Sequence, residues 1–218
     1  MLEVKGLNAG YGRAQVLFDA ALELRAGEVV VLAGRNGAGK STTLKAIMGL
    51  LPTLSGEILF ESRNLKLLRS HEIARLGLGY VPEDRRIFGE LSVAENLEVG
   101  RQPVRPGVPA WTPEKLFALF PNLAGMKDRP GARMSGGEQK MLAIARTLMG
   151  NPAALLLDEP SEGIAPLLAL RMADTIRELK QAGVSVLLCE QNLEFARRIA
   201  DRAYLIERGR ISENPLPP

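Results

Sequence analysis

The segment that most restricts the fold is the glycine-rich stretch Gly34-Arg-Asn-Gly-Ala-Gly-Lys-Ser41. It follows Val29–Ala33, a short apolar run rich in β-branched residues, and it leads into apolar residues at helical spacing that end near Gly49. A strand, a tight glycine turn and a helix in this order place successive backbone N–H groups around one anion, and the positive end of the helix adds to the attraction. The sequence therefore predicts a phosphate-binding loop within an α/β fold.

Two side chains of this loop carry most of its chemistry. Lys40 would reach the β- and γ-phosphates of a nucleotide, and the Ser41 hydroxyl would ligate Mg²⁺. By itself, the motif indicates a nucleotide and does not indicate a reaction. The other loop residues that we expect to contact the nucleotide are Gly34, Arg35, Asn36, Gly37, Ala38, Gly39 and Thr42.

A second motif is the apolar run Leu155–Leu157, which ends in Asp158 and Glu159. Asp158 would hold Mg²⁺ through water, and Glu159 would polarise the attacking water as a general base. Solvated acids at the end of a strand are a common alternative. The presence of both motifs in one chain favours a nucleotide site.

The third motif is Met134-Ser-Gly-Gly-Glu-Gln139. Ser135, Gly136 and Gly137 at the start of a helix would make another anion site. Taken alone, this segment is more simply interpreted as a helix cap.

Composition excludes several classes of protein. Lys and Arg number 28 against 25 Asp and Glu, and without a dense basic block this mild excess does not demand nucleic acid. Cys189 is the single cysteine, which excludes an internal disulfide framework, and its apolar surroundings indicate a buried strand. The start Met1–Lys5 lacks a signal-peptide pattern, and no apolar run approaches the ~20 residues of a membrane span. We therefore expect a cytoplasmic protein that reaches the membrane only through a partner.

The α/β pattern continues outside these motifs. Ala154–Leu157 and Val184–Leu188 are strand candidates on either side of Pro166–Ala182, whose apolar residues recur at helical spacing, so parallel pairing is expected. Ala203–Ile206 is a further candidate strand. Near the start, apolar and polar residues alternate as in antiparallel strands in Leu2–Leu7 and Val16–Arg25, with Gly56–Phe60 as a candidate third strand.

A helical block interrupts this core between residues 88 and 150. We expect helices over Ser92–Val99 and Thr112–Phe120 and from Ser135 or Gly136 to Leu148, with a loop at Gln102–Pro109. The prediction is one domain over residues 1–218. Residues 1–87 and 151–218 form the α/β core with its N-terminal antiparallel part, and residues 88–150 form the helical subdomain.

The motifs together resemble the ATPase domain of ABC transporters over nearly the whole chain. The resemblance rests on Tyr11, Gly34–Ser41, Ser135–Gln139 and Leu155–Pro160 in this order. It implies a RecA-like P-loop NTPase core with an antiparallel β subdomain and an inserted α-helical subdomain. It also implies that two such domains join head to tail, with each ATP between the phosphate loop of one and Ser135-Gly136-Gly137 of the other. Tyr11, by stacking, and Val16 would contact adenine.

Five segments resemble one branch of this family, the ATP-binding subunits of importers for branched-chain amino acids, with urea-importer subunits as close relatives. This branch implies transmembrane permease subunits, a second ATPase subunit that is identical or different, and a periplasmic solute-binding protein that acts indirectly. It places the chain on the cytoplasmic face of the inner membrane and involves no nucleic acid. The segments are Tyr80–Phe88, Leu91–Leu97, Met134–Gln139, Glu159–Pro166 and Glu190–Asn192.

Three positions depart from the general family pattern. Glu83 stands where most members have a glutamine, and it is expected either to ligate Mg²⁺ or to end a strand in solvent. Gln191 stands in place of a histidine, so it can donate a hydrogen bond to the γ-phosphate but cannot carry a proton at neutral pH. Ala165 replaces an aspartate that crosses the dimer interface. His71, the only histidine, is expected at the surface, and the short tail after Ile206 is either natural or a truncation.

Three functions remain open from the sequence. The first is the ATPase subunit of an importer, and the second is a soluble ABC ATPase outside transport. The third, a kinase with a phosphate loop, leaves Ser135–Gln139 unexplained. For the importer, Arg85–Phe88 is the expected contact with the permease, although Ile87 and Phe88 suit the core equally well.

Overall fold

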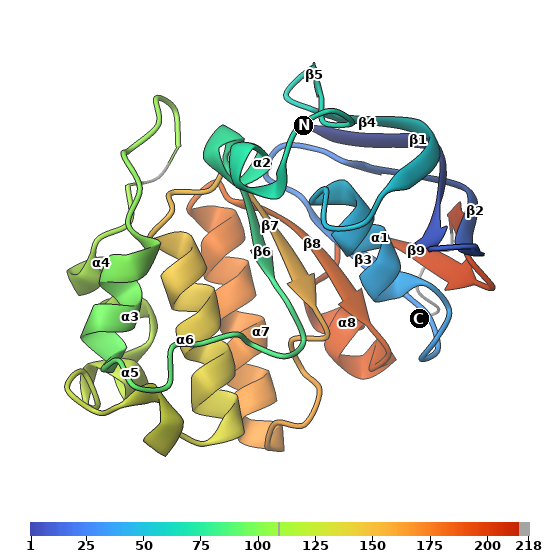
Figure 1. Cartoon of the computed structure of the whole chain (residues 1–218). Coiled ribbons are helices and arrows are strands. Elements are labelled where there is room, and N and C mark those ends of the chain that lie inside the picture. Colours follow the sequence, from blue (N-terminus) through green and yellow to red (C-terminus); the bar gives the residue numbers. More distant parts are fainter. Residues whose placement is uncertain (109, 214–218) are drawn as a thin grey trace.

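Two sheets of different kinds frame the molecule (Figure 1), a computed structural model that describes residues 1–108 and 110–213. The larger sheet has the strand order β10-β9-β3-β8-β7-β6, and all neighbours are parallel except β10 and β9. This confirms the parallel core expected around the phosphate loop. Its strands are β3 (Val29–Ala33), β6 (Leu78–Val81), β7 (Ala154–Asp158), β8 (Ser185–Glu190), β9 (Arg202–Glu207) and β10 (Arg210–Glu213).

The central parallel strands are buried on both faces, which explains their continuous apolar runs. In β3, Val29 and Val31 pack with the helices on one side of the sheet. Val30 and Leu32 point the other way and pack with α1 (Lys40–Ile47) and the antiparallel sheet. The sheet therefore separates two apolar cores.

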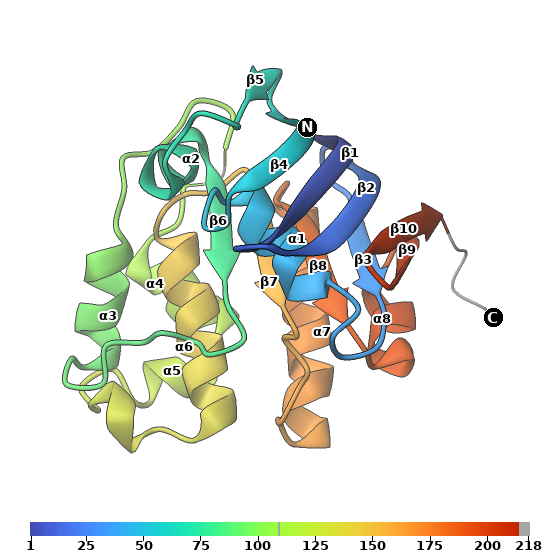
Figure 2. The same cartoon turned by 45° about the vertical axis from the view of Figure 1, so that its right-hand side comes forward.

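The smaller sheet is antiparallel and has the order β2-β1-β4-β5. In β1, Leu2 lies opposite Leu24 of one neighbour and Phe60 of the other, so the candidate third strand is confirmed. Figure 2 shows α1 between this sheet and the parallel one. The bounds are β1 (Leu2–Tyr11), β2 (Ala14–Leu24), β4 (Thr53–Phe60) and β5 (Arg63–Asn64).

Two of the predicted helices begin at serine N-caps, as their sequences indicated. Ser92 and Ser135 each accept a hydrogen bond from the N–H three residues on, and the glutamate there binds back to the cap N–H. Among the described residues, none of the helices has the length and apolarity of a membrane span. The helices are α2 (Ser70–Leu76), α3 (Val93–Gly100), α4 (Pro113–Leu119), α5 (Pro121–Ala124), α6 (Gly136–Leu148), α7 (Pro166–Gln181) and α8 (Leu193–Ile199), with a 3-10 turn at Gly131–Arg133.

The interval 88–150 contains α3, α4 and α6 where the sequence predicted helices, and also the short α5, which was not predicted. Most of the predicted loop Gln102–Pro109 is irregular, with a turn near its end, while Pro109 and the tail Asn214–Pro218 lie outside the described residues. In Figure 1, α6 and α7 cover the face of the parallel sheet opposite α1, and α3 and α4 lie outside them. The division into a core and an inserted subdomain stays a prediction.

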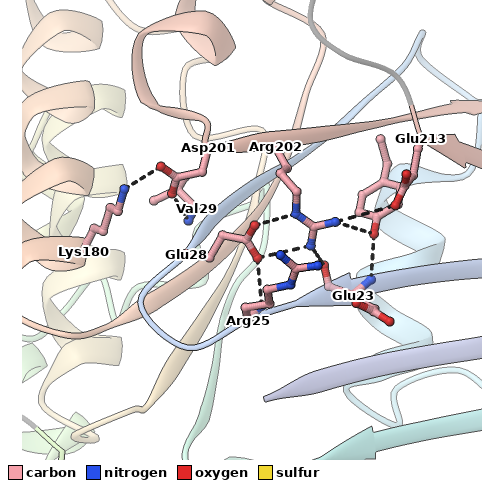
Figure 3. Close-up of polar contacts among 9 residues, drawn as sticks. Glu23, Arg25, Glu28, Val29, Lys180, Asp201, Arg202 and Glu213 are labelled. Carbon is pink, nitrogen blue, oxygen red and sulfur yellow. Dashed lines mark hydrogen bonds and ion pairs between the residues drawn. The ribbon is translucent and has the colours of Figure 1, made fainter.

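An ion-pair network centred on Arg202 joins the two sheets at one edge (Figure 3). Arg202 Nε donates to Glu28 Oε1 at 2.5 Å, and Nη2 donates to the carbonyl oxygen of Glu23 in β2 at 3.0 Å. Burial raises the pKa of Glu28, but the hydrogen bonds from Arg202 and the Arg25 N–H, with the positive charges of both arginines, together hold that pKa below its ordinary value. Asp201 adds a link to α7, because it accepts hydrogen bonds from the Val29 N–H and from Lys180.

Candidate nucleotide site

The phosphate loop turns sharply between β3 and α1. Gly37 and Gly39 have φ angles of 78° and 117°, which are costly for any residue with a Cβ atom. Gly39 caps α1 without a side chain, so the free N–H groups of the helix start face outward. The loop therefore has the backbone that an anion site requires.

Lys40 folds back over this loop. Its Nζ donates to the carbonyl oxygens of Gly34 at 2.8 Å and Arg35 at 3.1 Å. It also forms an ion pair with Glu159, with 3.0 Å between Nζ and Oε1. The structure therefore brings together the two residues that the sequence named for phosphate binding and for water activation.

Ser41 and Asp158, the two expected metal ligands, also meet. Ser41 Oγ donates to Asp158 Oδ1 at 2.9 Å, and the Tyr80 hydroxyl donates to Asp158 Oδ2 at 3.4 Å. Burial raises the pKa of Asp158; the hydrogen bond from Ser41 opposes this shift, and the negative charges of Glu159 and Glu83 add to it. A bound cation would offset the negative charge that gathers around this buried carboxyl.

Glu159 is held in an uncommon backbone conformation with φ of 49°. Its N–H donates to the carbonyl oxygen of Cys189 in β8 at 3.1 Å. Burial raises the pKa of Glu159, but the Glu162 carboxyl, the hydrogen bond from Lys40 and the positive charges of Lys40 and Lys140 together hold it below its ordinary value. The carboxylate is therefore ionised at neutral pH, as a general base must be.

The remaining candidates on this chain lie at the rim of the site. Gln191 is exposed and lines the same pocket as the loop segment Gly34–Ala38. Glu83 is exposed just beyond β6, near enough for its charge to act on Asp158. His71 is exposed on α2, as expected, and Cys189 is fully buried in β8.

The hairpin of β1 and β2 adjoins the phosphate loop through Gly209. The Gly209 N–H donates to the carbonyl oxygen of Ala38 at 2.8 Å, and its carbonyl accepts the Phe18 N–H at 2.9 Å. A Cβ atom at position 209 would overlap the carbonyl oxygen of Val16. Tyr11, at the end of β1, is 48% exposed, so its ring is free to stack on a base.

Ser135-Gly136-Gly137 does not join this site within one chain. It begins α6, whose buried side chains pack in the core on the face of the parallel sheet opposite α1. A Cβ atom at Gly136 would meet the guanidinium group of Arg85, and one at Gly137 would meet the side chains of Ile164 and Leu168. Ser135 and Gly136 are exposed, and the role expected of them toward the ATP of a second chain stays a prediction.

Sequence reasoning missed three polar residues around the acids. Tyr80 contacts Asp158, and Lys140 and Glu190 bind the loop after β7. Lys140 is the only one with a sequence signal, because a lysine within the apolar stripe of a helix needs an internal partner.

Comparison with known proteins agrees with this geometry. The family model described as ABC transporter matches residues 17–162. The chain is 43% identical over 211 residues to the high-affinity branched-chain amino acid transport ATP-binding protein BraG of Pseudomonas aeruginosa, covering 97% of this chain and 91% of that protein. It is 35% identical to the lipopolysaccharide export system ATP-binding protein LptB of Acidithiobacillus ferridurans, and the match covers 97% of this chain and 88% of LptB. A solved nucleotide-free ATP-binding cassette from an ABC transporter superposes with a TM-score of 0.84 at 28% identity, covering 99% and 91%.

Proposed function

The chain belongs to the ABC transporter family, and we propose that it is the ATP-hydrolysing subunit that energises an importer of branched-chain amino acids. The contact between Lys40 and Glu159 is the observation that carries the hydrolytic part. It places a phosphate-binding cation next to an ionised carboxylate, at the phosphate loop. The solute class rests on the 43% identity to BraG.

Lys40 would exchange partners when ATP binds. A γ-phosphate offers its ammonium group a stronger anion than Glu159, so Glu159 would be released toward water. The loop N–H groups and the start of α1 would hold the remaining phosphate charge. Tyr11 and Val16 would contact adenine from the hairpin beside the loop.

The residues present fit Mg²⁺. Among the described residues, no three acidic, histidine or cysteine side chains form a metal cage. Mg²⁺ does not need one, because it usually takes one or two protein oxygens, several waters and substrate phosphates. Ser41 and Asp158 would hold it, with Glu83 as a further carboxylate, and it would neutralise charge on the phosphates.

Glu159 would orient and polarise the attacking water, while Gln191 would donate its amide hydrogens to the γ-phosphate. The two roles suit their positions, because Glu159 is buried beside Lys40 and Gln191 is exposed at the rim of the same loop. Gln191 has no titratable group, so Glu159 would act as the base without help from a histidine.

A second ATPase subunit, identical or different, would complete the site. Ser135, Gly136 and the start of α6 offer free N–H groups at an exposed helix end. Because α6 and the phosphate loop lie on opposite faces of the parallel sheet, this end would serve the ATP of the partner.

The permease subunits would dock on a groove of about 520 Å³ between α2, β6, α3 and α6. Phe88, from the segment expected at this contact, lines the groove and is 47% exposed. Ile87 instead packs against the core. Arg146 lies over the Phe88 ring, 5.0 Å from its centre. An apolar floor with cationic edges suits a short permease helix on the cytoplasmic face of the inner membrane.

Transport by the complete complex tests the solute. The chain would be reconstituted with its permease subunits and binding protein in vesicles, with ATP enclosed. We expect ATP-dependent uptake of labelled leucine, none with Glu159→Gln, and ATPase stimulation by the leucine-loaded binding protein. Uptake of urea without leucine would reassign the solute. Co-purification with ribosomes or nucleic acid in place of permeases would indicate a soluble ATPase.

A further inference from the structure

The loop that carries Glu159 lies between two buried side chains of opposite charge. Lys140 on α6 is 4% exposed, and Glu190 at the end of β8 is 2% exposed. Charged groups this deep need strong partners, because removing them from water is costly. Both find backbone partners in the same loop, residues 159–162.

Lys140 holds the loop by its carbonyl groups. Its Nζ donates to the carbonyl oxygens of Glu159 at 2.5 Å and Glu162 at 3.0 Å. The Glu162 N–H also donates to the Glu159 carbonyl at 3.2 Å, so the segment closes as a turn. Because Glu159 has a positive φ, the turn needs support from its surroundings. The ammonium group of Lys140 supplies that support.

Glu190 holds the same loop from the other side through one N–H group, that of Ser161. Its carboxylate accepts the Ser161 N–H at 2.8 Å and the Asn192 N–H at 3.3 Å. Burial lowers the pKa of Lys140, and the negative charge of Glu190 opposes that shift. The cation and the anion therefore compensate each other across the loop.

We infer that Lys140 is a positioning residue that sets Glu159 for water attack and joins it to the start of α6. Lys140 lies five residues after Ser135 on the same helix. It therefore connects the base of one ATP site to the helix end that faces the other. The inference rests on the proposed roles of Glu159 and of Ser135.

Hydrolysis by Lys140 variants of the full chain tests the inference. Lys140→Met keeps the length of the side chain and removes both hydrogen bonds. We expect kcat to fall roughly 10- to 100-fold, because small displacements of a catalytic group have effects of this size, with little change in KM for ATP. Lys140→Arg, which keeps the charge and the donors, should recover most of the rate. Lys66→Met removes an exposed lysine and should match wild type.

A Glu159→Gln background separates positioning from general damage. If Lys140 acts through Glu159, then Lys140→Met adds no further loss to the residual rate of Glu159→Gln. An additional loss there, or a fall in ATP affinity that parallels kcat, would overturn the inference. If Lys140→Met does not fold, Lys140→Leu replaces it, because leucine also removes both hydrogen bonds and is a good helix former. A normal rate for Lys140→Met beside a slow Glu159→Gln refutes the inference alone; a normal rate for Glu159→Gln refutes the proposed base and the inference with it.

Discussion

Lys40 and Glu159 form a buried ion pair across the phosphate loop, with 3.0 Å between Nζ and Oε1 and side-chain exposures of 3% and 9%. The pair joins the two main motifs of the sequence, which are more than a hundred residues apart. Each partner satisfies the charge of the other at a depth where an unpaired charge would be costly. A γ-phosphate would compete with Glu159 for Lys40, so nucleotide binding and release of the base are coupled.

Replacing Lys40 should weaken ATP binding. Lys40→Met removes the cation for the γ-phosphate, and hydrogen bonds to charged groups of this kind correspond to roughly 10- to 100-fold in affinity. Titration with a fluorescent ATP analogue measures the change. Lys45→Met, on the same helix, serves as the control and should bind as wild type does. If Lys40→Met binds the ATP analogue with unchanged affinity, Lys40 does not contact the phosphates.

The Arg202 network predicts a pH-dependent contribution to stability. The pKa of Glu28 lies below its ordinary value of 4.5 because the hydrogen bonds and positive charges of Arg202 and Arg25 together outweigh burial. A lowered pKa stabilises the fold above the unfolded-state pKa, and that contribution disappears as the pH falls through the folded-state value. Glu28→Gln should therefore cost about 1–2 kcal/mol in the free energy of unfolding at pH 7.

Urea unfolding at pH 7 and near pH 4 checks this sign. The difference between wild type and Glu28→Gln should shrink at the lower pH. A difference that stays constant or grows on acidification would show that the charge of Glu28 is not what stabilises the joint between the sheets.

Gly209 links the hairpin to the phosphate loop, and a side chain there should disturb both. Gly209→Ala would place a Cβ atom against the Val16 carbonyl at a φ of 77°. We expect a loss of about 2–3 kcal/mol in unfolding free energy and weaker ATP binding, because the backbone shift that relieves the overlap would move the residue 209 N–H away from the Ala38 carbonyl. Gly183→Ala, which has positive φ but open space, should cost only about 1 kcal/mol and leave ATP binding intact. Equal effects in the two variants would contradict the proposed link.

Phe88 should matter for the permease and not for the isolated ATPase. Phe88→Ala removes half-exposed apolar surface from the groove, so we expect reduced co-purification with the permease subunits and an unchanged basal ATPase rate. Leu67→Ala removes an apolar side chain that is 93% exposed elsewhere and serves as the control. If Phe88→Ala binds the permease subunits as wild type does, the docking surface lies outside this groove.

The parts of the fold that the sequence predicted are those with strong local signals. β3, β7 and β8 are continuous apolar runs, and α3 and α6 start at serine caps with a glutamate three residues on. α8 and β10 were missed. α8 has seven residues, and β10 is an edge strand with little buried surface. Such elements depend on neighbours that are distant in the chain.

For the site residues too, those within local motifs were predicted and those held by contacts distant in the chain were not. Lys40, Ser41, Asp158 and Glu159 belong to local motifs, and the structure brings them together. The contacts of Lys140 and Glu190 go to backbone groups of a loop between 19 and 29 residues away, and backbone groups leave no side-chain pattern in the sequence.

The central claim is that Glu159 activates water at a site that binds ATP through Lys40, and single-turnover hydrolysis by Glu159→Gln tests it most directly. The variant and wild type would be loaded with labelled ATP, and bound nucleotide and released phosphate would be followed together. We predict that ATP binds at least as tightly as in wild type while the hydrolysis rate falls about 10²- to 10⁴-fold, the usual contribution of a general base. Hydrolysis at the wild-type rate by a variant that binds ATP normally would contradict the account.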